Sequence, residues 1–525
     1  MLSLTKEEFS KYARQGYTHI PLIKDILADL DTPLSAYLKL ANEPYTYLLE
    51  SVHGGEKWGR YSIIGLKCQQ HIRVKENIIS HYELTSEGEN CISEIESQDP
   101  LAWIEDYQQQ YHIPSIWNND NDMPRFLGGL VGYFGYETIK YIEPRLAKNQ
   151  SEKKDELQTP DIFLLISNEL IVFDNLSGRL YLVVHAKIPS SPDQQAIDNA
   201  WNNSFTHLES LAKKLISDSA CVQSSDASAN TIVQEDDFIS GFTQAGYEAG
   251  VNKIKQYITD GDAMQVVLSQ RMTIPFKAPP INLYRALRSI NPSPYMYFFN
   301  LDSFHIVGAS PEILTRVEDK TITVRPIAGT RPRGKTAKED KDLELDLLAD
   351  PKELAEHLML IDLGRNDIGR VCKTGTVTLT DKMIVERYSH VMHIVSNVEG
   401  QLNDNTSVMD ALRATFPAGT VSGAPKIRAM EIIDELEPVK RGIYSGAIGY
   451  FSWTGNLDTA IAIRTAVIKD EKLHIQAGAG IVADSVPRNE WDETMNKGRS
   501  IFRAVSLAQC NLDTDCNNPS QKKKK

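Results

Sequence analysis

Two pairs of glutamates with the same spacing are the first candidates for chemistry in this sequence. Glu353 and Glu356 lie three residues apart in a stretch whose leucines and isoleucines recur at helical period. Glu490 and Glu493 repeat that spacing near the C-terminus, also in a helical pattern. Residues three apart share one helix face, so each pair sets two carboxylates side by side. Four oxygen donors on two helices suit a hard cation such as Mg²⁺, although two solvated helix faces would carry the same pattern.

The first pair needs a helix that holds it in place. Asp350 and Pro351 directly precede the pair, and these residue types favour the cap and the first turn of a helix. The apolar period then continues to Arg365. The sequence therefore predicts a helix that presents Glu353 and Glu356 within its first two turns.

Two segments of small residues could receive a ligand. In a Gly/Pro turn after a predicted strand, Gly329 allows close approach of the backbone and Thr330 adds a hydroxyl. The small side chains of Gly478-Ala479-Gly480 would leave backbone N–H groups open to an anion such as a carboxylate. The alternatives are a basic surface loop for the first segment and a tight strand crossing for the second.

Two polar residues have apolar neighbours. Arg464 falls within the alternating apolar pattern of a predicted strand. A charge that is buried there without a partner would cost free energy of folding. A substrate carboxylate held bidentately would supply its partner, and so would a structural Asp or Glu. His393, in the segment Ser389–His393, is equally compatible with a hydrogen-bonded core histidine.

The composition excludes several classes of protein. The 525 residues carry a net charge of −14, which argues against nucleic acid or an anionic membrane as the main partner. No apolar run approaches the length of a membrane span, and the first residues turn charged too early for a secretory signal. The six cysteines form no C-x-x-C pair, so we expect reduced thiols in a cytoplasmic protein.

The order of predicted elements indicates the fold class. Strands and helices follow one another without regular βαβ alternation, which is typical of an α+β fold with large antiparallel sheets. The predicted strands beside the candidate residues are 264–274, 295–299, 304–314 and 321–327. A Ser/Asp/Ala-rich stretch is the candidate linker. It divides the chain into an N-terminal region 1–216, the linker 217–237, a second region 238–508 and a polar tail 509–525.

Ordered motifs along the chain resemble those of the chorismate-utilising enzymes. They run in the family's order from about residue 45 to residue 500. The matching segments are Leu48–Ser51, Pro294–Met296, Gly308–Glu312, Pro326–Thr330, Glu353–His357, Asp362–Asp367, Ser389–His393, Gly419–Lys426, Gln476–Gly480 and Asp492–Thr494. The resemblance implies two large, mostly antiparallel sheets packed as a sandwich with helices outside.

The resemblance is greatest to the members that form anthranilate. It implies a Mg²⁺ enzyme that converts chorismate and ammonia to anthranilate and pyruvate. Ammonia would come from a separate glutamine amidotransferase subunit. Isochorismate-forming relatives carry a lysine where this chain has Gln265, whose amide does not titrate and cannot activate water. Aminodeoxychorismate-forming relatives carry a nucleophilic lysine where this chain has Ala328, so free ammonia would attack directly.

Other functions stay open at this point. Aminodeoxychorismate or isochorismate synthesis is the alternative within the family. A metallohydrolase that uses the glutamate pairs is the alternative from another class. Its H-E-x-x-H motif is absent from the sequence. The related H-x-x-E-H motif would end at Glu356 and His357, but its first position, 353, is Glu and not His. A non-catalytic amino-acid sensor on the same scaffold is the third.

The resemblance also implies roles for individual residues. Glu356 and Glu493 would bind Mg²⁺, with Glu353 and Glu490 completing the shell. The enolpyruvyl carboxylate would be held by a separate set, namely Arg464, Tyr444 and the amides of Gly478, Ala479 and Gly480. Gly329 and Thr330 would contact the region of the ring carboxylate.

Four residues would act on the reaction itself. Glu312 would protonate the leaving hydroxyl, a task that needs a pKa raised towards neutrality. His393 would assist the elimination of pyruvate, and Thr420 would position ammonia. Gln265 is the fourth member of this catalytic set, at the position where it cannot act as a base to activate water.

A regulatory site is the last implication of the resemblance. Ser51, with Pro294, Tyr295 and Met296, matches the family's tryptophan pocket, where tryptophan would act as feedback inhibitor. The N-terminal region would then be regulatory, and the region 238–508 would bind chorismate. Ordinary packing between the two regions is the alternative.

Overall fold

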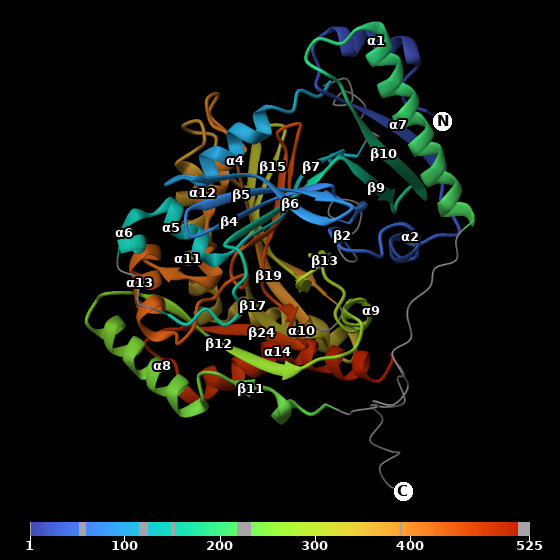
Figure 1. The fold of residues 1–525 in the computed structure, drawn as a ribbon. Coiled ribbons are helices and arrows are strands. Elements are labelled where there is room, and N and C mark those ends of the chain that lie inside the picture. The colour runs from blue at the N-terminus through green and yellow to red at the C-terminus, as the bar shows by residue number, and fades with distance from the viewer. Residues whose placement is uncertain are drawn as a thin grey trace, which may run out of the picture.

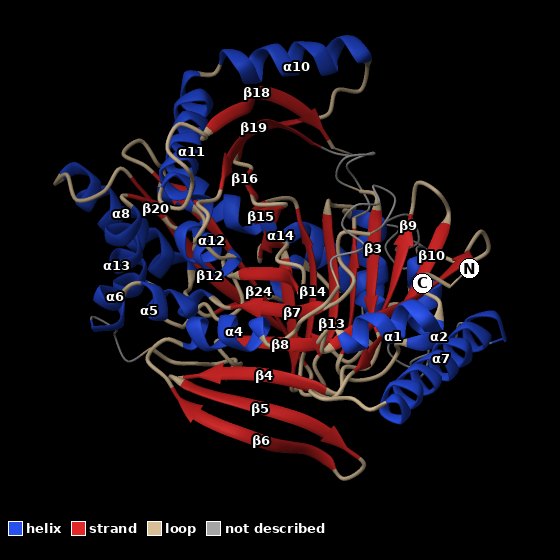
Figure 2. Ribbon diagram, turned by 90° about the horizontal axis from the view of Figure 1, so that it is seen from above, coloured by secondary structure: helices blue, strands red, loops and turns tan. Residues whose placement is uncertain are grey.

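The computed structural model describes residues 2–51, 59–114, 124–148, 153–217, 233–388 and 391–512. In these ranges the chain forms two large antiparallel sheets with helices around them (Figures 1 and 2). No helix in the ranges is long and apolar enough to cross a membrane. The cysteines within them are free thiols, namely Cys68, Cys91, Cys372 and Cys510.

Sheet A joins strands from the beginning and the end of the chain. Its order is β1 (His19–Leu27), β10 (Arg179–Lys187), β9 (Glu169–Asp174), β3 (Tyr61–Gly65), β2 (Thr46–Glu50), β13 (Tyr295–Asn300), β14 (His305–Ser310), β23 (Thr465–Lys469), β24 (Lys472–Ile481), β12 (Gln265–Pro275) and β11 (Ile239–Ser240). The short strand β20 (Gly423–Ala424) also pairs with β12.

Sheet B is built in the same way. Its order is β17 (Ile327–Pro332), β19 (Val391–Gln401), β16 (Thr321–Val324), β15 (Ile313–Glu318), β22 (Leu457–Ile461), β21 (Ala447–Ser452), β7 (Gly129–Phe134), β8 (Ile162–Ser167), β4 (Gln70–Lys75), β5 (Ile78–Thr85) and β6 (Gly88–Glu96). The strand β18 (Thr378–Arg387) pairs with the other edge of β19.

Both sheets take strands from both sides of the predicted linker. Residues 218–232 of that linker lie outside the described residues, and the rest comprises the end of α7 and the short 3-10 helix η3 (Glu235–Asp237). The two predicted regions therefore share one sandwich, and the boundary itself stays a prediction. Most of the predicted tail, residues 513–525, also lies outside the described ranges.

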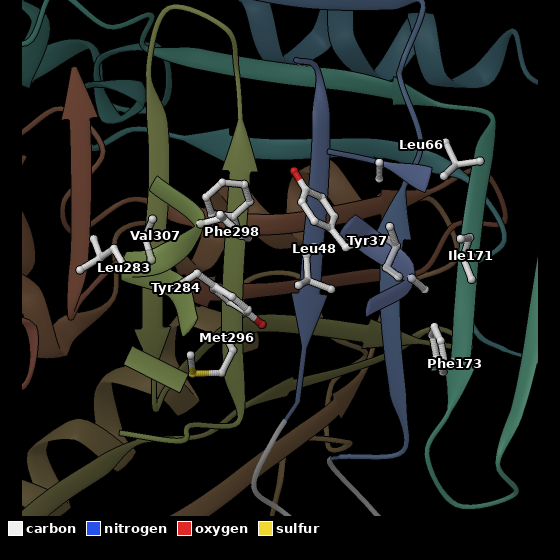
Figure 3. Close-up of a cluster of buried hydrophobic side chains, with 14 of the residues drawn as sticks. Tyr37, Leu48, Leu66, Ile171, Phe173, Leu283, Tyr284, Met296, Phe298 and Val307 are labelled. Carbon is white, nitrogen blue, oxygen red and sulfur yellow. The ribbon is translucent and has the colours of Figure 1, made fainter. Parts of the chain in front are cut away.

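Helices pack on the sheets through separate apolar cores. One core joins sheet A to α1 (Lys6–Arg14), α2 (Pro33–Leu40), α7 (Gln194–Ser217), α9 (Pro280–Ile290) and α14 (Pro487–Gln509). Figure 3 shows part of it, where Leu283 and Tyr284 of α9 lie against Phe298 and Val307 of sheet A. The second core joins sheet B and the β12–β24 end of sheet A to α4 (Pro100–Gln109), α8 (Gln244–Thr259), α11 (Pro351–Gly369), α12 (Val408–Thr415) and α13 (Lys426–Leu436).

A third core fills the space between the two sheets. Tyr47 and Phe299 of sheet A are buried in one cluster with Val131, Phe163 and Ile448 of sheet B. The remaining helical segments are α5 (Ile139–Ile142), α6 (Pro144–Lys148), α10 (Ala337–Ala349), η2 (Tyr136–Thr138) and η4 (Gly419–Val421). The predicted α+β fold, with two large antiparallel sheets as a sandwich and helices outside, is confirmed.

Two predicted strands differ from the structure. The strand predicted over 321–327 ends at Val324, and Ile327 begins a separate strand, β17. The sequence predicts a single strand over 304–314, but β14 ends at Ser310 in sheet A and β15 begins at Ile313 in sheet B. Pro311 lies at the break, where it cannot donate a hydrogen bond to a strand ladder. The chain therefore passes from one sheet to the other at Glu312.

Candidate active site

The helix α11 begins where the sequence predicts. The Asp350 side chain accepts hydrogen bonds from the N–H groups of Lys352 and Glu353, at 3.0 and 3.4 Å. Pro351 occupies the first turn, and the helix continues to Gly369. Glu353 and Glu356 therefore lie in its first two turns, as predicted.

The second pair of glutamates lies on α14 and faces the same space. Burial raises the pKa of Glu356, and the charges of Glu353 and Glu493 raise it further. Burial also raises the pKa of Glu490, with a contribution from Glu493 and an opposing one from Lys352 of α11. The two helices thus bring both pairs close enough to repel one another.

Sequence reasoning missed Lys497, which lies one turn after Glu493. Its Nζ is 2.8 Å from Glu493 Oε1 and donates to the carbonyl of Gly478 at 2.9 Å. Burial lowers the pKa of Lys497, but Glu493, Tyr444 and Glu356 outweigh it and the net shift is upward. The spacing of four residues from Glu493 is the signal that could have identified it.

The donor chemistry of the glutamate pairs fits a divalent cation. Carboxylates that raise one another's pKa are relieved by a positive charge between them, and Mg²⁺ needs few protein ligands because it keeps several waters. Among the described residues, no three His, Cys, Asp or Glu side chains gather into a ready metal site. The Lys497 ammonium supplies the positive charge next to Glu493, so binding of Mg²⁺ stays a prediction.

Gln265 lies between the glutamates and β24. Its Nε2 donates to Glu356 Oε1 at 3.5 Å. Its Oε1 is buried without a hydrogen-bond partner among the described residues. A Cβ on Gly480 would lie 2.4 Å from Gln265 Nε2, so Gly480 leaves the space that the amide occupies.

The glycine segment of β24 is part of the sheet and not an open loop. Gly478, Ala479 and Gly480 pair with residues of β12. On the other edge, β23 pairs with β24 only as far as Ile475, so the described strands leave that edge of the segment open. A Cβ on Gly478 would lie 2.9 Å from the hydroxyl of Tyr444, which is buried beside it.

Glu312 lies beside η4, at the point where the chain crosses from β14 of sheet A to β15 of sheet B. It is 4% exposed, and the Thr420 hydroxyl donates to its Oε1 at 2.7 Å. Burial raises the pKa of Glu312 to about 7, although Thr420, Arg464 and Lys497 act in the opposite direction. A carboxyl group with this pKa can donate a proton near neutral pH.

His393 is held by the turn of Gly329 and Thr330. The His393 Nδ1 lies 2.8 Å from the Gly329 carbonyl and 3.1 Å from Thr330 Oγ1. Burial lowers the pKa of His393 to about 4, so the ring is neutral at pH 7. With its Nδ1–H donating to that carbonyl, Nε2 is left as an acceptor.

Gly329 has the conformation that its residue type suggests. Its φ is +69°, and a Cβ there would lie 3.2 Å from Glu353 Oε2. The pairing of β17 with β19 is irregular at this position, so Gly329 brings the turn close to the first glutamate pair. Ser389 and His390 of the neighbouring motif lie outside the described residues.

The prediction that Arg464 lies within a strand is wrong. It lies between β22 of sheet B and β23 of sheet A, with a φ of +50°. The apolar sequence pattern continues from β22 through Arg464 into β23. The pattern therefore gives no sign that one strand ends and another begins there. Over the described residues Arg464 makes no ion pair with Asp or Glu, and burial lowers its pKa while Tyr388 and Glu312 raise it. A buried cation thus lies beside Glu312.

Comparison with known proteins agrees with this arrangement. Residues 52–503 match the family described as chorismate binding enzyme. The chain belongs to the chorismate binding enzyme family. The resemblance predicted from the ordered motifs is confirmed.

Individual members of the family place the chain more closely. Anthranilate synthase component 1 of Pseudomonas aeruginosa is 56% identical over 510 residues, which cover 97% of this chain and 100% of that protein. The crystal structure of anthranilate synthase component I from Streptococcus pneumoniae matches with a TM-score of 0.70 and 35% identity, covering 91% of this chain and 98% of that one. The menaquinone-specific isochorismate synthase of Escherichia coli, at 18% identity, shares the fold with a TM-score of 0.66, covering 95% and 98%.

This chorismate binding enzyme has a cavity between its two sheets, apart from the glutamate pairs. It has a volume of about 330 Å³, and all of the predicted effector residues line it, namely Ser51, Pro294, Tyr295 and Met296. Arg316 donates to the Tyr295 hydroxyl at 2.8 Å and to Asp458 at 2.7 Å, so charged groups form one wall. The Met296 side chain packs in the outer core of sheet A (Figure 3).

The close approach at Gly480 gives a first prediction for this chorismate binding enzyme. Gly480→Ala is expected to lower kcat/KM for chorismate about tenfold, because the new methyl group must displace Gln265 from Glu356. Gly369→Ala is the matched control, since a Cβ there contacts nothing within 4 Å and alanine favours the helix. Steady-state kinetics of both variants provide the measurement. Equal kcat/KM values for the two variants would contradict the prediction.

Proposed function

We propose that this chain catalyses the formation of anthranilate and pyruvate from chorismate and ammonia, the first committed step of tryptophan biosynthesis. The supporting observation is the buried Glu312, with a pKa of about 7, beside Arg464, which has no carboxylate partner among the described residues of this chorismate binding enzyme. The relatives named anthranilate synthase component 1 support the same activity. Gln265 and Ala328 stand where family members with other nucleophiles carry lysine.

Substrate binding follows from the charges of the site. Arg464, Tyr444 and the Gly478–Gly480 segment would hold the enolpyruvyl carboxylate, because a bidentate guanidinium is the strongest partner for such a group. Glu356 and Glu493, with Glu353 and Glu490, would hold Mg²⁺. When bound, this ion supplies positive charge beside the ring carboxylate. Gly329 and Thr330 would contact the same end of the ring.

The proposed reaction needs one group that donates a proton, Glu312, and one that accepts a proton, His393. Ammonia adds to the ring carbon beside the carboxylate, and the ring hydroxyl leaves as water with the proton of Glu312. The added nitrogen then releases one proton to become a neutral amine, and the Glu312 carboxylate takes up one proton to regain its acid form. Thr420 keeps Glu312 oriented through its 2.7 Å hydrogen bond and lies where ammonia could be positioned. The ring carbon that carries the nitrogen then loses its proton, and the bond between the ring and the enolpyruvyl oxygen breaks, which makes the product aromatic. The released enolpyruvate takes up one proton at its methylene carbon and becomes pyruvate. His393 would assist this elimination, since its neutral Nε2 can accept a proton.

We also propose that ammonia is delivered by a separate glutamine amidotransferase subunit. The support is the name of the relatives, anthranilate synthase component 1, which implies a second component. The purified chain should then use ammonium salts but not glutamine. Addition of the glutaminase subunit should restore the use of glutamine.

Product formation tests the proposed function directly. The purified chain is incubated with chorismate, Mg²⁺ and ammonium at mildly alkaline pH, and anthranilate is followed by its fluorescence. We expect product in the complete mixture and none without ammonium or after chelation of Mg²⁺. Formation of isochorismate or aminodeoxychorismate in place of anthranilate would contradict the proposal.

The cavity between the sheets is proposed as the site for feedback inhibition by tryptophan. Ser51→Phe is expected to raise the tryptophan concentration for half-inhibition about tenfold or more, because the new ring fills space that the ligand needs. Ser303→Phe, at an exposed turn, is the matched control. Inhibition curves that coincide for the wild type and Ser51→Phe would exclude this cavity as the tryptophan site.

A further inference from the structure

Two segments of the chain cross from one sheet to the other, and they lie side by side next to the candidate active site. One leads from β14 through Glu312 to β15, and the other from β22 through Arg464 to β23. Backbone hydrogen bonds join them, from Ala309 N–H to the Arg464 carbonyl at 3.1 Å and from Ile461 N–H to the Glu312 carbonyl at 3.0 Å. The proton donor therefore lies where both sheets are tied together.

Ser310 closes this junction. Its side chain is fully buried, and its hydroxyl donates to the Ile461 carbonyl at 2.7 Å. The N–H of the same Ile461 holds the Glu312 carbonyl. One residue of sheet B thus binds the end of β14 through the Ser310 side chain and the following Glu312 through the backbone.

The same strands form a wall of the cavity between the sheets. Tyr295 of β13 is the pairing partner of Ser310, and its hydroxyl donates to Asp458 Oδ1 at 2.7 Å. Asp458 and Ile461 both lie on β22, three residues apart, which is about 10 Å along a strand. Two side-chain links between the sheets, Tyr295–Asp458 and Ser310–Ile461, therefore join the paired strands β13 and β14 of sheet A to one strand, β22, of sheet B.

We propose that Ser310 is a positioning residue for Glu312, and that the Tyr295–Ser310 strand pair transmits occupancy of the cavity between the sheets to the proton donor. This inference rests on the proposed function, because it assigns a route to the inhibition proposed above. Tyr295, Arg316 and Asp458 line this cavity, so a ligand that fills it would contact these side chains. Any shift it causes between Tyr295 and Asp458 changes the separation of the sheets at the Ser310–Ile461 link.

The physical reason is the short range of proton transfer. A donor must lie within hydrogen-bond reach of the leaving oxygen, about 2.6–3.2 Å, so a small displacement of Glu312 lowers turnover more than binding. Paired strands resist shear along their ladders, so displacement at one link reaches the next. Inhibition by this route acts on kcat without any contact between the inhibitor and chorismate.

Ser310→Ala tests the positioning role. We expect kcat to fall about tenfold to a hundredfold while KM for chorismate changes less than about threefold. We also expect the alkaline limb of the pH–rate profile to move to lower pH, because a Glu312 freed from the junction is better solvated. The charged groups that face Glu312, Arg464 and Lys497, are unchanged in this variant.

Ser167→Ala is the matched control. Ser167 is also a fully buried serine whose hydroxyl links the two sheets, through a 2.7 Å hydrogen bond to Tyr47 far from Glu312. Both variants should lose similar thermal stability, but only Ser310→Ala should lower kcat and raise the tryptophan concentration for half-inhibition about fivefold. If Ser310→Ala does not fold, Ser310→Cys keeps the volume with a weaker donor and should show the same changes to a smaller degree.

Each outcome decides one part of the inference. A kcat and a pH profile that match those of Ser167→Ala would overturn the positioning role. A lowered kcat with unchanged inhibition by tryptophan would overturn the transmission from the cavity. Failure of the wild type to form anthranilate would instead contradict the proposed function, and it is measured in the same assay before any variant.

Discussion

Exchange of Glu312 for glutamine is expected to lower kcat for anthranilate formation about a thousandfold. The amide keeps the volume of the carboxyl group and can still accept the hydrogen bond from Thr420. It does not titrate, so it cannot transfer a proton to the leaving hydroxyl. Because burial raises the pKa of Glu312 to about 7, the wild type should lose the protonated donor as the pH rises through that value. The remaining activity of Glu312→Gln should lack this alkaline limb.

Glu137→Gln is the matched control for that measurement. Glu137 is also a buried glutamate whose pKa burial raises, but it accepts hydrogen bonds from the backbone N–H groups of Arg441 and Gly442 and not from Thr420. Its kcat should stay within about threefold of the wild type. If Glu312→Gln keeps more than about a tenth of the wild-type kcat, Glu312 is not the acid.

Exchange of Glu356 for glutamine is expected to have an effect of similar size on the Mg²⁺-dependent reaction. The variant removes one negative charge from a set of carboxylates that already raise one another's pKa, and an amide oxygen is a weaker ligand for a hard cation. We expect kcat/KM to fall about a thousandfold at low Mg²⁺ and to recover only partly at high Mg²⁺. Steady-state rates over a series of Mg²⁺ concentrations give this comparison.

Asp362→Asn provides the matched control on the same helix. Asp362 is exposed on α11 and pairs only with Arg365, at 3.3 Å, among the described residues. Its removal changes the net charge of the helix equally but leaves the facing glutamates intact. A loss in Asp362→Asn as large as that in Glu356→Gln would show that overall charge, and not a specific ligand, matters.

The glutamate helices were predictable because their signals are local. A capping Asp350, Pro351 in the first turn and a continuous apolar period determine the start of α11 without reference to the rest of the chain. The spacing of Glu353 and Glu356 then settles which face they share. The same local rule applies to Glu490 and Glu493 on α14.

The two points where the chain crosses between the sheets, at Glu312 and Arg464, were not predictable from local sequence signals. Alternating apolar residues continue from β14 into β15 and from β22 into β23, although each pair of strands belongs to different sheets. Whether such a run bends is decided by long-range pairing, and only Pro311 gave a local indication. Glu312 and Arg464 owe their proximity to these crossing points.

The cavity between the sheets was predictable only through the family resemblance. Ser51 follows β2, and Tyr295 and Met296 lie on β13, with Glu50 and Met296 as pairing partners across more than 200 residues of sequence. No period or spacing within either segment specifies that pairing. Lys497 was missed for the opposite reason, since its local spacing from Glu493 was available but matched a solvated helix face equally well.

Calorimetric titration of Mg²⁺ into the chain with chorismate present, and without ammonium, tests most directly whether the two glutamate helices together hold the metal. We expect about one ion bound per wild-type chain and no measurable binding to the double variant Glu356→Gln/Glu493→Gln. Equal Mg²⁺ affinity in the double variant and the wild type would contradict the assignment of the metal to these helices.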